Sequence, residues 1–409
     1  MTLHETPQKL TKAGLFLFAL GLPVSHVPAQ FGIAIAVLGW ILDGLINKRW
    51  RARWHIVFAP LIFYLLWNVF AAAISARPLH SLGAVADNEW ALVMMLMLFW
   101  TVDDVKMLSN LVYAFLATSS AATVYAIWQT FAGVELYRGV PLGPMGWGFY
   151  RSVGFYGFYL TFAGFAMTVF FLSSGFWVEL KTKMRWLFGT LAVASFLAVV
   201  ATFARSIWLS FGAAIPLFAF TRSRRIGLIV TAALFIVVSA GILTLPAIRF
   251  RVESIIDISQ NETRLNLWKT ALRIAQDHPV TGVGEDNWDY VFDNYRVDGY
   301  YDTIVHPHND YLTVLVSSGV PGLLAFLAIW GVTLTAGFRA SLYANDERLR
   351  AIALGSTFSV VGLLVGGIFQ NYYGSFINCL GWWFVTGLLF AASALASQEK
   401  GKTGEVQRG

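Results

Sequence analysis

The stretch VHPHNDYLTVLVSSGVPGLLAFL, residues 305–327, joins a polar cluster directly to a run of side chains apolar enough to enter a bilayer. The polar part contains His306, His308, Asn309 and Asp310. Such residues could belong to a solvated loop, or they could form a reactive site at a membrane surface. Choosing between these interpretations requires the rest of the chain and the side of the membrane that the histidines face.

The composition favours a membrane protein. Of the 409 residues, 57% are hydrophobic and 13% are charged, whereas soluble domains have about 25% charged residues. A single cysteine, Cys379, excludes an intrachain disulfide and a cage of thiolate ligands for a metal ion. The apolar run after Lys9 and Lys12 is not followed by a small-residue cleavage site, so we expect it to remain as the first helix.

Apolar windows long enough to cross a hydrocarbon layer recur along the chain. A crossing helix needs about 20 residues, with a range of about 17–25. The sequence therefore predicts an all-α fold, a polytopic bundle of transmembrane helices with about twelve crossings. The predicted crossings are 12–27, 31–47, 56–75, 83–101, 107–131, 152–174, 186–202, 206–221, 226–245, 320–338, 349–369 and 375–395.

A long gap in this pattern divides the chain. We expect helical crossings in residues 1–245, a long helical loop in 246–319, the last three crossings in 320–396 and a polar tail in 397–409. If the crossings alternate, most of the 29 Lys and Arg residues fall on the side of the N-terminus. Positive charge concentrates on the cytoplasmic side of membrane proteins. Both termini are therefore expected in the cytoplasm, with the long loop outside.

Two helices are expected in the region of the long loop. The segment NETRLNLWKTALRIAQDHP, residues 261–279, has apolar residues at helical spacing and Asn261 as a candidate N-cap. Residues 308–318 form a short amphipathic pattern that Gly319 and Pro321 would end before the next crossing. The polar cluster of the opening stretch would therefore begin a helix at the outer face.

His308 is the first candidate for chemistry. A histidine at a membrane surface can simply cap a helix or contact headgroups. Here it opens a helix beside Asn309 and Asp310. A neutral imidazole can remove a proton from a hydroxyl group, so His308 is a candidate general base, and His306 could compete for this role.

A metal site is the second interpretation of the same cluster, because Asp302, His306, His308 and Asp310 lie close together in the sequence. Two histidines separated by one proline are a weak metal signal, and the helical HExxH spacing is absent. We therefore expect no metal ion and no other cofactor.

Three arginines on the expected outer side are further candidates. Arg205 and Arg151 each stand at the outer end of a predicted crossing, and Arg264 lies on the predicted loop helix. Each could contact lipid headgroups. Together they could bind a diphosphate without a metal ion, since a guanidinium binds phosphate oxygens in a bidentate manner and stays charged.

Four motifs resemble those of a known family. HNDYLTVLVSSGVPG at 308–322 resembles an HN-x-(Y/F)-L…G-x-x-G signature, and TRLNLWKTALRIAQDHPVTGVG at 263–284 resembles an R…W…A…HP-x-x-G-x-G segment. ARSIWLS at 204–210 and RSVGFYGFY at 151–159 resemble two arginine-containing stretches. The chain is similar to bacterial O-antigen ligases, in a wider group that includes O-antigen polymerases and protein O-oligosaccharyltransferases.

The resemblance implies a function and a set of site residues. It implies transfer of a glycan from undecaprenyl diphosphate to a sugar hydroxyl of the lipid A core, with inversion and without a metal ion. His308, Arg205 and Arg264 would take the family's catalytic positions, and Arg151 would help to bind the diphosphate. The site would face the periplasm of a bacterial inner membrane. The expected partners are the donor, the acceptor and the bilayer, with no nucleic acid.

The residues themselves fit this chemistry, and three alternatives stay open. The first outer loop, LPVSHVPAQ at 22–30, contains no carboxylate, which favours a mechanism based on His and Arg. An O-antigen polymerase or a protein O-oligosaccharyltransferase would use similar residues on another acceptor. A transporter of lipid-linked glycans is the alternative that is not an enzyme. No predicted crossing has an Asp, Glu or Lys convincingly at its middle, which counts against a proton-coupled transporter.

Overall fold

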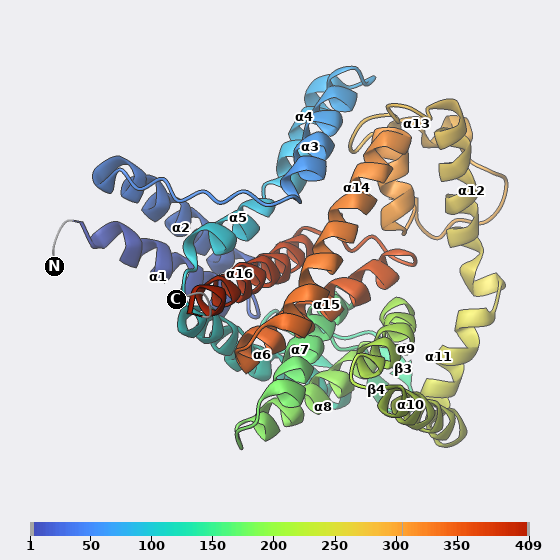
Figure 1. The fold of residues 1–409 in the computed structure, drawn as a ribbon. Coiled ribbons are helices and arrows are strands. Elements are labelled where there is room, and N and C mark those ends of the chain that lie inside the picture. Colours follow the sequence, from blue (N-terminus) through green and yellow to red (C-terminus); the bar gives the residue numbers. More distant parts are fainter. Residues whose placement is uncertain (1–3, 305, 407–409) are drawn as a thin grey trace.

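The computed structural model describes residues 4–304 and 306–406, and it is built almost entirely of helices (Figure 1). The first half contains α1 (Thr6–Gly21), α2 (His26–Asn47), α3 (Phe58–Ala73), α4 (Pro78–Glu89), α5 (Leu92–Thr101), α6 (Val105–Ala132), α7 (Tyr159–Glu179) and α8 (Arg185–Ala201). The second half contains α9 (Arg205–Phe220), α10 (Arg224–Thr244), α11 (Pro246–Ile256), η1 (Ser259–Asn261), α12 (Glu262–Asp277), α13 (Trp288–Tyr295), α14 (Asp310–Tyr343), α15 (Glu347–Gly367) and α16 (Phe376–Val406).

The predicted helical membrane architecture is confirmed at a coarse level. Eight helical spans in the described residues are long and apolar enough to cross a membrane. Three shorter apolar helices, α3, α8 and α9, accompany them. The number of crossings stays a prediction. The spans are 26–47, 78–101, 105–132, 159–179, 224–244, 310–343, 347–367 and 376–399.

Several predicted boundaries were wrong. The window 152–174 becomes helical only at Tyr159, because Gly154 and Gly157 adopt positive φ values of 56° and 73°. The window 83–101 lies within the candidate span 78–101, which begins earlier than predicted and contains two helices, α4 and α5. α2 begins at His26, so most of the expected first outer loop is helical.

α16 continues to Val406, through the first part of the segment expected as a polar tail. Residues 407–409 of that tail and Val305 of the long loop lie outside the described residues.

Four short strands were not expected from the sequence. They form two antiparallel pairs between α6 and α7. The strands are β1 (Val134–Glu135), β2 (Val140–Pro141), β3 (Pro144–Gly146) and β4 (Phe149–Tyr150).

Helices α7, α15 and α16 form the centre of the bundle. In the most apolar stretch of each of these helices, 83%, 78% and 83% of the residues, respectively, are buried inside the structure. In the peripheral α10 the corresponding share is 6%. Helices α7 and α15 approach closely, because a Cβ on Gly175 would lie 2.3 Å from the carbonyl oxygen of Ala351. Small residues permit this packing between membrane helices.

Contacts between the connecting segments define two ends of the bundle. At one end, which we call the site face, Arg77 before α4 donates to the side chains of Asn287 (2.9 Å) and Asp289 (2.6 Å) near α13. At the opposite face, Glu179 after α7 accepts from Arg350 on α15 (2.9 Å) and from Arg222 after α9. Helices α12 and α13 lie on the site face beside the start of α14, and α11 joins them to α10 (Figure 1).

Candidate functional site

The three residues after His308 anchor the start of α14. The Asn309 side chain accepts from the N–H of Leu312 (3.0 Å) and donates to the carbonyl oxygen of Ile368 (2.9 Å). The Asp310 carboxylate accepts from the N–H of Tyr373 (2.9 Å), and the Tyr311 hydroxyl donates to α15. These polar groups therefore bind α14 to the end of α15 and to the loop 368–375.

His308 is presented to the site by this anchored turn. Its φ of 51° is a left-handed conformation that non-glycine residues rarely adopt. Its Nδ1 lies 3.0 Å from Oε1 of the buried Gln370, in the loop between α15 and α16. Since a carbonyl oxygen only accepts, Nδ1 carries the proton and Nε2 keeps a lone pair. That tautomer leaves Nε2 able to act as a base.

The surroundings of His308 keep its ring neutral. Burial is the largest influence and lowers its pKa below the ordinary histidine value, while the hydrogen bond to Gln370 acts in the opposite direction. The charge of Arg264 also lowers this pKa, and Asp302 raises it. A neutral imidazole at physiological pH satisfies the first requirement for a general base.

His306 has a different role in the geometry. Its Nδ1 accepts the backbone N–H of His308 at 3.0 Å, and the two ring centroids lie 4.2 Å apart. Burial, followed by the charges of His308 and Arg264, lowers the pKa of His306 to about 3. The ring therefore stays neutral and holds the turn that presents His308.

Arg205 and Arg264 line one cleft of about 250 Å³ between α9, α12 and the end of α15. Arg205 is oriented by the carbonyl oxygens of Ser254 and Gln260, to which its guanidinium donates. The remaining lining is mainly apolar and consists of Ser206, Leu209, Ile255, Ile256, Ile258, Asn261, Leu265, Trp268 and Phe369. The cleft thus combines two cations with an apolar wall.

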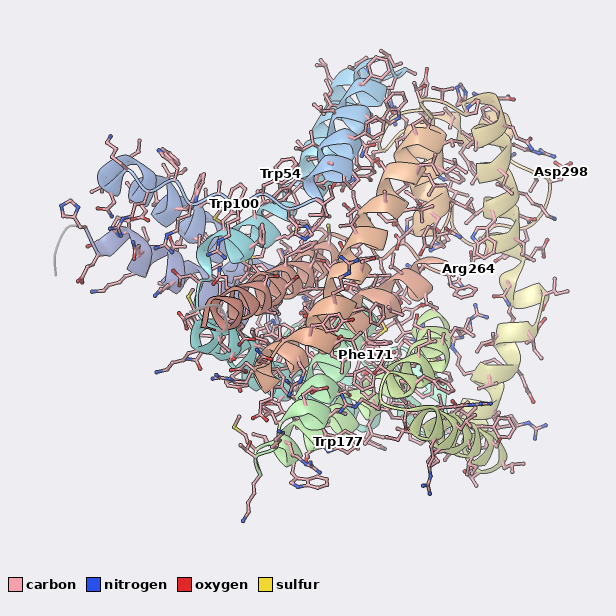
Figure 2. The ribbon with its side chains drawn as sticks, viewed as in Figure 1. Trp54, Trp100, Phe171, Trp177, Arg264 and Asp298 are labelled. Carbon is pink, nitrogen blue, oxygen red and sulfur yellow. The ribbon has the colours of Figure 1, made fainter. Side chains whose placement is uncertain are left out.

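Arg264 is a half-buried cation that has no counterion in the part of the chain that the structure describes. It lies at the start of α12, on the site face, where Figure 2 labels it. Its side chain makes no hydrogen bond or ion pair with any residue in 4–304 or 306–406. Burial is the largest influence on its pKa, which it lowers, and Tyr159, Tyr372 and Asp302 act in the opposite direction. A guanidinium left unpaired at a cleft is suited to binding an anion.

Arg151 lies next to this pair, in the non-helical segment before α7. Its guanidinium carbon lies 4.0 Å from the ring centroid of Tyr159, in a cation–π contact. Its Nε is buried and has no hydrogen-bond partner among the described residues. Arg151, Arg205 and Arg264 are therefore brought to one region of the site face from three separate segments.

Two residues near the site, Arg251 and Gln370, were not predicted from the sequence. Arg251 on α11 donates through Nε to the carbonyl oxygen of Phe203 (2.8 Å), and burial lowers its pKa to about 10, with Arg151 and Arg205 contributing. Nothing in the sequence separates it from the other positive charges of the long loop. Gln370 had a usable signal, because it is a polar residue in a short segment expected on the outer side, like His308.

The sequence cluster considered as a metal site does not come together as one. Asp310 points to the loop after α15, where its Oδ1 accepts from Tyr373. Over the described part of the chain, no group of three or more His, Cys, Asp or Glu side chains could hold a metal ion.

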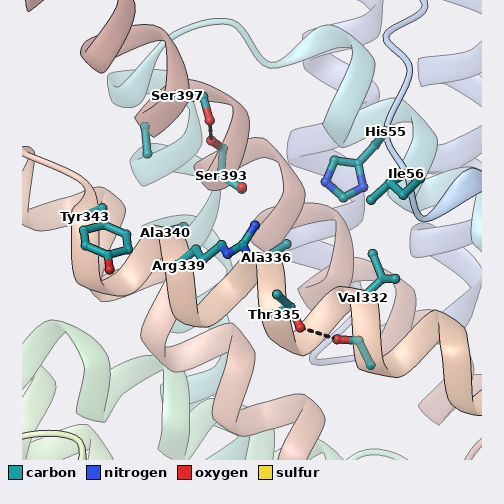
Figure 3. Close-up of a pocket in the computed structure, with 12 residues that line it drawn as sticks. His55, Ile56, Val332, Thr335, Ala336, Arg339, Ala340, Tyr343, Ser393 and Ser397 are labelled. Atoms are coloured by element: carbon teal, nitrogen blue, oxygen red, sulfur yellow. Dashed lines mark hydrogen bonds between the residues drawn. The ribbon is translucent and has the colours of Figure 1, made fainter.

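A larger cavity of about 560 Å³ lies on the opposite face, between α14, α16 and the segment before α3 (Figure 3). Arg339 on α14 and His55 before α3 are among its lining residues, together with Ser393 and Ser397 on α16. The residues that line this cavity include one arginine and one histidine, but no glutamine that could orient the histidine. We therefore place the candidate site at the smaller cleft.

Comparison with known proteins finds one family match, which covers part of the chain. A family model described as O-antigen ligase matches residues 190–327, a range that contains Arg205, Arg264 and His308. No curated protein was found to match the chain. The match indicates a membrane enzyme of the O-antigen ligase or polymerase type, acting on a lipid-linked glycan and an acceptor. It confirms the resemblance seen in the motifs: over residues 190–327, the chain is similar to the O-antigen ligase family.

Proposed function

We propose that this protein is an O-antigen ligase, which transfers a glycan from undecaprenyl diphosphate to a sugar hydroxyl of the lipid A core. One observation carries the proposal. Arg205, Arg264 and Trp268 line the same cleft, and Trp268 donates to the carbonyl oxygen of Pro307 (3.0 Å), the residue before His308. A base for the incoming hydroxyl and cations for a leaving diphosphate thus meet at one site.

The proposed reaction assigns a task to each group. Nε2 of His308 takes the proton of the acceptor hydroxyl while the acceptor oxygen bonds to the anomeric carbon of the glycan. The bond from that carbon to the diphosphate oxygen breaks, and its electron pair leaves with the diphosphate. Attack from the face opposite the leaving group inverts the linkage. No metal ion takes part in these steps.

The arginines stabilise the charge that develops on the leaving diphosphate. Arg205 is held at the cleft by the carbonyl oxygens of Ser254 and Gln260, and Arg264 lines the same cleft. A donor that is already held in place, as Arg205 is, needs little rearrangement as the charge grows. The apolar side chains of the same cleft suit the isoprenoid part of the donor.

We propose that the site faces the periplasm of a bacterial inner membrane and that both termini are cytoplasmic. In this arrangement residues 1–245 and 320–396 hold the crossings, 246–319 form the periplasmic loop and 397–409 the cytoplasmic tail. Two observations support it: the bias of Lys and Arg toward the side of the N-terminus, and the ion pair that joins segments expected on that side, between Arg51 and Asp103 (2.8 Å).

Reconstitution tests the proposal. The purified protein in vesicles receives a glycan on undecaprenyl diphosphate, together with a lipid A core acceptor. A ligase forms the joined product. A polymerase would lengthen the lipid-linked glycan, a protein O-oligosaccharyltransferase would modify a Ser- or Thr-containing peptide, and a transporter would only move the donor across the bilayer. Any of these results without the lipid A product would contradict the proposal.

A further inference from the structure

The site face carries more positive charge than a diphosphate requires. Four arginines, Arg151, Arg205, Arg251 and Arg264, influence one another electrostatically. A diphosphate that is esterified at both ends has a single negative charge on each phosphate. If Arg205 and Arg264 bind these two charges, Arg151 and Arg251 remain to be explained.

Arg251 is fixed close to Arg205 by reciprocal contacts. Arg251 on α11 donates to the carbonyl oxygen of Phe203, and Arg205 donates to the carbonyl oxygen of Ser254 on α11. Among the charged neighbours of Arg251, Arg151 lowers its pKa the most. Arg151 and Arg251 therefore form a second pair of cations beside the first.

This second pair is half-buried and has no acidic partner. Neither Arg151 nor Arg251 makes a salt bridge within 4–304 and 306–406, and the buried Nε of Arg151 has no hydrogen-bond partner there. Arg249, on the same helix as Arg251, differs from this pair: it is exposed and forms a salt bridge with Glu253 at 2.9 Å. Two adjacent cations without a carboxylate are costly unless an anion binds to them.

Two exposed aromatic rings lie on the segments that carry the second pair. The rings of Trp147 and Phe250 have their centroids 6.4 Å apart, and the two side chains are 56% and 47% exposed. Phe250 directly precedes Arg251, and Trp147 lies in the turn that leads to Arg151. Exposed aromatic faces pack well against the apolar faces of sugar rings, so this neighbourhood suits a glycan.

We propose that Arg151 and Arg251, with Trp147 and Phe250, form a second subsite that binds a sugar bearing a phosphate or carboxylate group next to the reacting centre. This proposal rests on the proposed glycan transfer and deepens it. The anionic group can come from the acceptor or from the glycan of the donor, and both sources share the same chemistry with guanidinium.

The test measures kcat/KM for matched pairs of substrates in reconstituted vesicles. In the first arm, a neutral donor glycan is combined with a lipid A core acceptor whose core phosphates are either present or removed. In the second arm, the dephosphorylated acceptor is combined with donors that differ only in one acidic sugar near the diphosphate. The arm in which the wild-type protein prefers the charged substrate identifies the source.

The expected result is that Arg251→Ala reduces this preference by about tenfold to a hundredfold, as for loss of a hydrogen bond to a charged group. Arg251→Lys keeps the charge and tests the same point if the alanine variant folds poorly, and it should lose most of the preference because the planar fork is absent. Arg249→Ala, on the same helix, should keep the preference.

Two results would overturn the subsite. One is a wild-type protein that treats charged and neutral substrates alike in both arms. The other is an Arg251→Ala variant that lowers transfer by the same factor for charged and neutral substrates, which is the behaviour of a headgroup anchor or of a purely structural residue. A wild-type protein that forms no product from any pair would instead contradict the proposed function.

Discussion

At the scale of single residues, the polar cluster at 306–310 divides into groups that hold the turn and one group that is free to react. The side chain of Asn309 forms hydrogen bonds with Ile368 and Leu312, and that of Asp310 forms one with Tyr373. The sequence predicted His308 as a candidate base, but it left the roles of its neighbours open. Two of these partners, Ile368 and Tyr373, lie 59 and 63 residues further along the chain, beyond the reach of local patterns.

We predict that His308→Ala abolishes transfer, whereas His306→Ala retains part of it. Loss of a general base costs about 10²–10⁴ in rate, and His306 contributes only through its contact with the N–H of His308. Product formation in vesicles, with thermal unfolding as a check of the fold, is the measurement. An inactive His306→Ala beside an active His308→Ala would show that the two roles are reversed.

Gln370 controls the pH dependence of the base. His308 must be neutral to accept a proton, and its lowered pKa keeps it neutral to a more acidic pH than an ordinary histidine. Gln370→Glu would place a carboxylate at Nδ1, favour the imidazolium and move the acidic limb of kcat/KM to higher pH. Gln370→Ala should move this limb to lower pH, because the hydrogen bond to Gln370 raises the pKa. Identical limbs in all three proteins would refute this role.

At the scale of elements, two glycine-containing motifs pair with each other. The turn after α12 runs beside the kink of α14, where the N–H of Val283 donates to Val316 (2.8 Å) and the N–H of Val320 donates to Pro279 (2.8 Å). The kink itself is at Gly319, with φ 66°. The sequence predicted a turn and a helix break at these places, but not their contact. This contact positions α12, and with it Arg264, against the start of α14.

Gly282 should therefore be intolerant of a side chain. Its φ is 63°, and an added Cβ would lie 2.3 Å from the carbonyl oxygen of Val316. We expect Gly282→Ala to lower the free energy of unfolding by about 1–3 kcal/mol and to reduce transfer. Gly331→Ala on α14 is the matched control, since its Cβ meets nothing within 4 Å. The measurement is thermal unfolding of both variants in detergent. Equal melting temperatures for Gly282→Ala and Gly331→Ala would argue against the contact between the turn and α14.

Hydropathy located the helices but misplaced several of their ends. The segment 152–158 is apolar enough to extend a helical window, yet Gly154 and Gly157 take left-handed conformations. α4 and α5 are separated at Trp90 and Ala91, inside a window that composition alone makes continuous. Composition reports where a chain prefers to lie, whereas helix ends depend on dihedral angles and caps.

At the scale of the whole molecule, the site is assembled from segments that no local pattern connects. Arg151, Arg205, Arg264 and His308 were each predicted from their own motif, and the fold brings them to the site face. Arg251 and Gln370 were missed because their significance depends on this assembly.

We predict that transfer does not depend on a divalent metal ion. Arginines, rather than Mg²⁺, carry the charge of the diphosphate in the proposed reaction. Transfer rates in vesicles should therefore be the same with and without excess EDTA. Loss of transfer in EDTA, followed by recovery on adding a divalent ion, would contradict the arginine mechanism.

The proposed orientation can be tested by labelling cysteines. Cys379 is buried, and Cys379→Ala gives a background without thiols. In that background, Arg249→Cys on the site face should react with a membrane-impermeant thiol reagent added to whole cells with a permeabilised outer membrane. Lys181→Cys, at the opposite face, should react only after the inner membrane is opened. The reverse pattern would place the site in the cytoplasm.

Arg205 and Arg264 are central to the proposed reaction, and replacing them tests that reaction most directly. The decisive measurement is single-turnover transfer together with donor binding for Arg205→Ala and Arg264→Ala. Arg296→Ala, at an exposed arginine near Asp293 (3.7 Å), is the control. Each site variant should lose about 10²–10³ in rate, with a smaller effect on donor binding, because the contacts strengthen as charge builds on the leaving oxygen. Lysine at either position should restore little. Near-normal transfer by both alanine variants would contradict the account and leave these arginines as headgroup anchors.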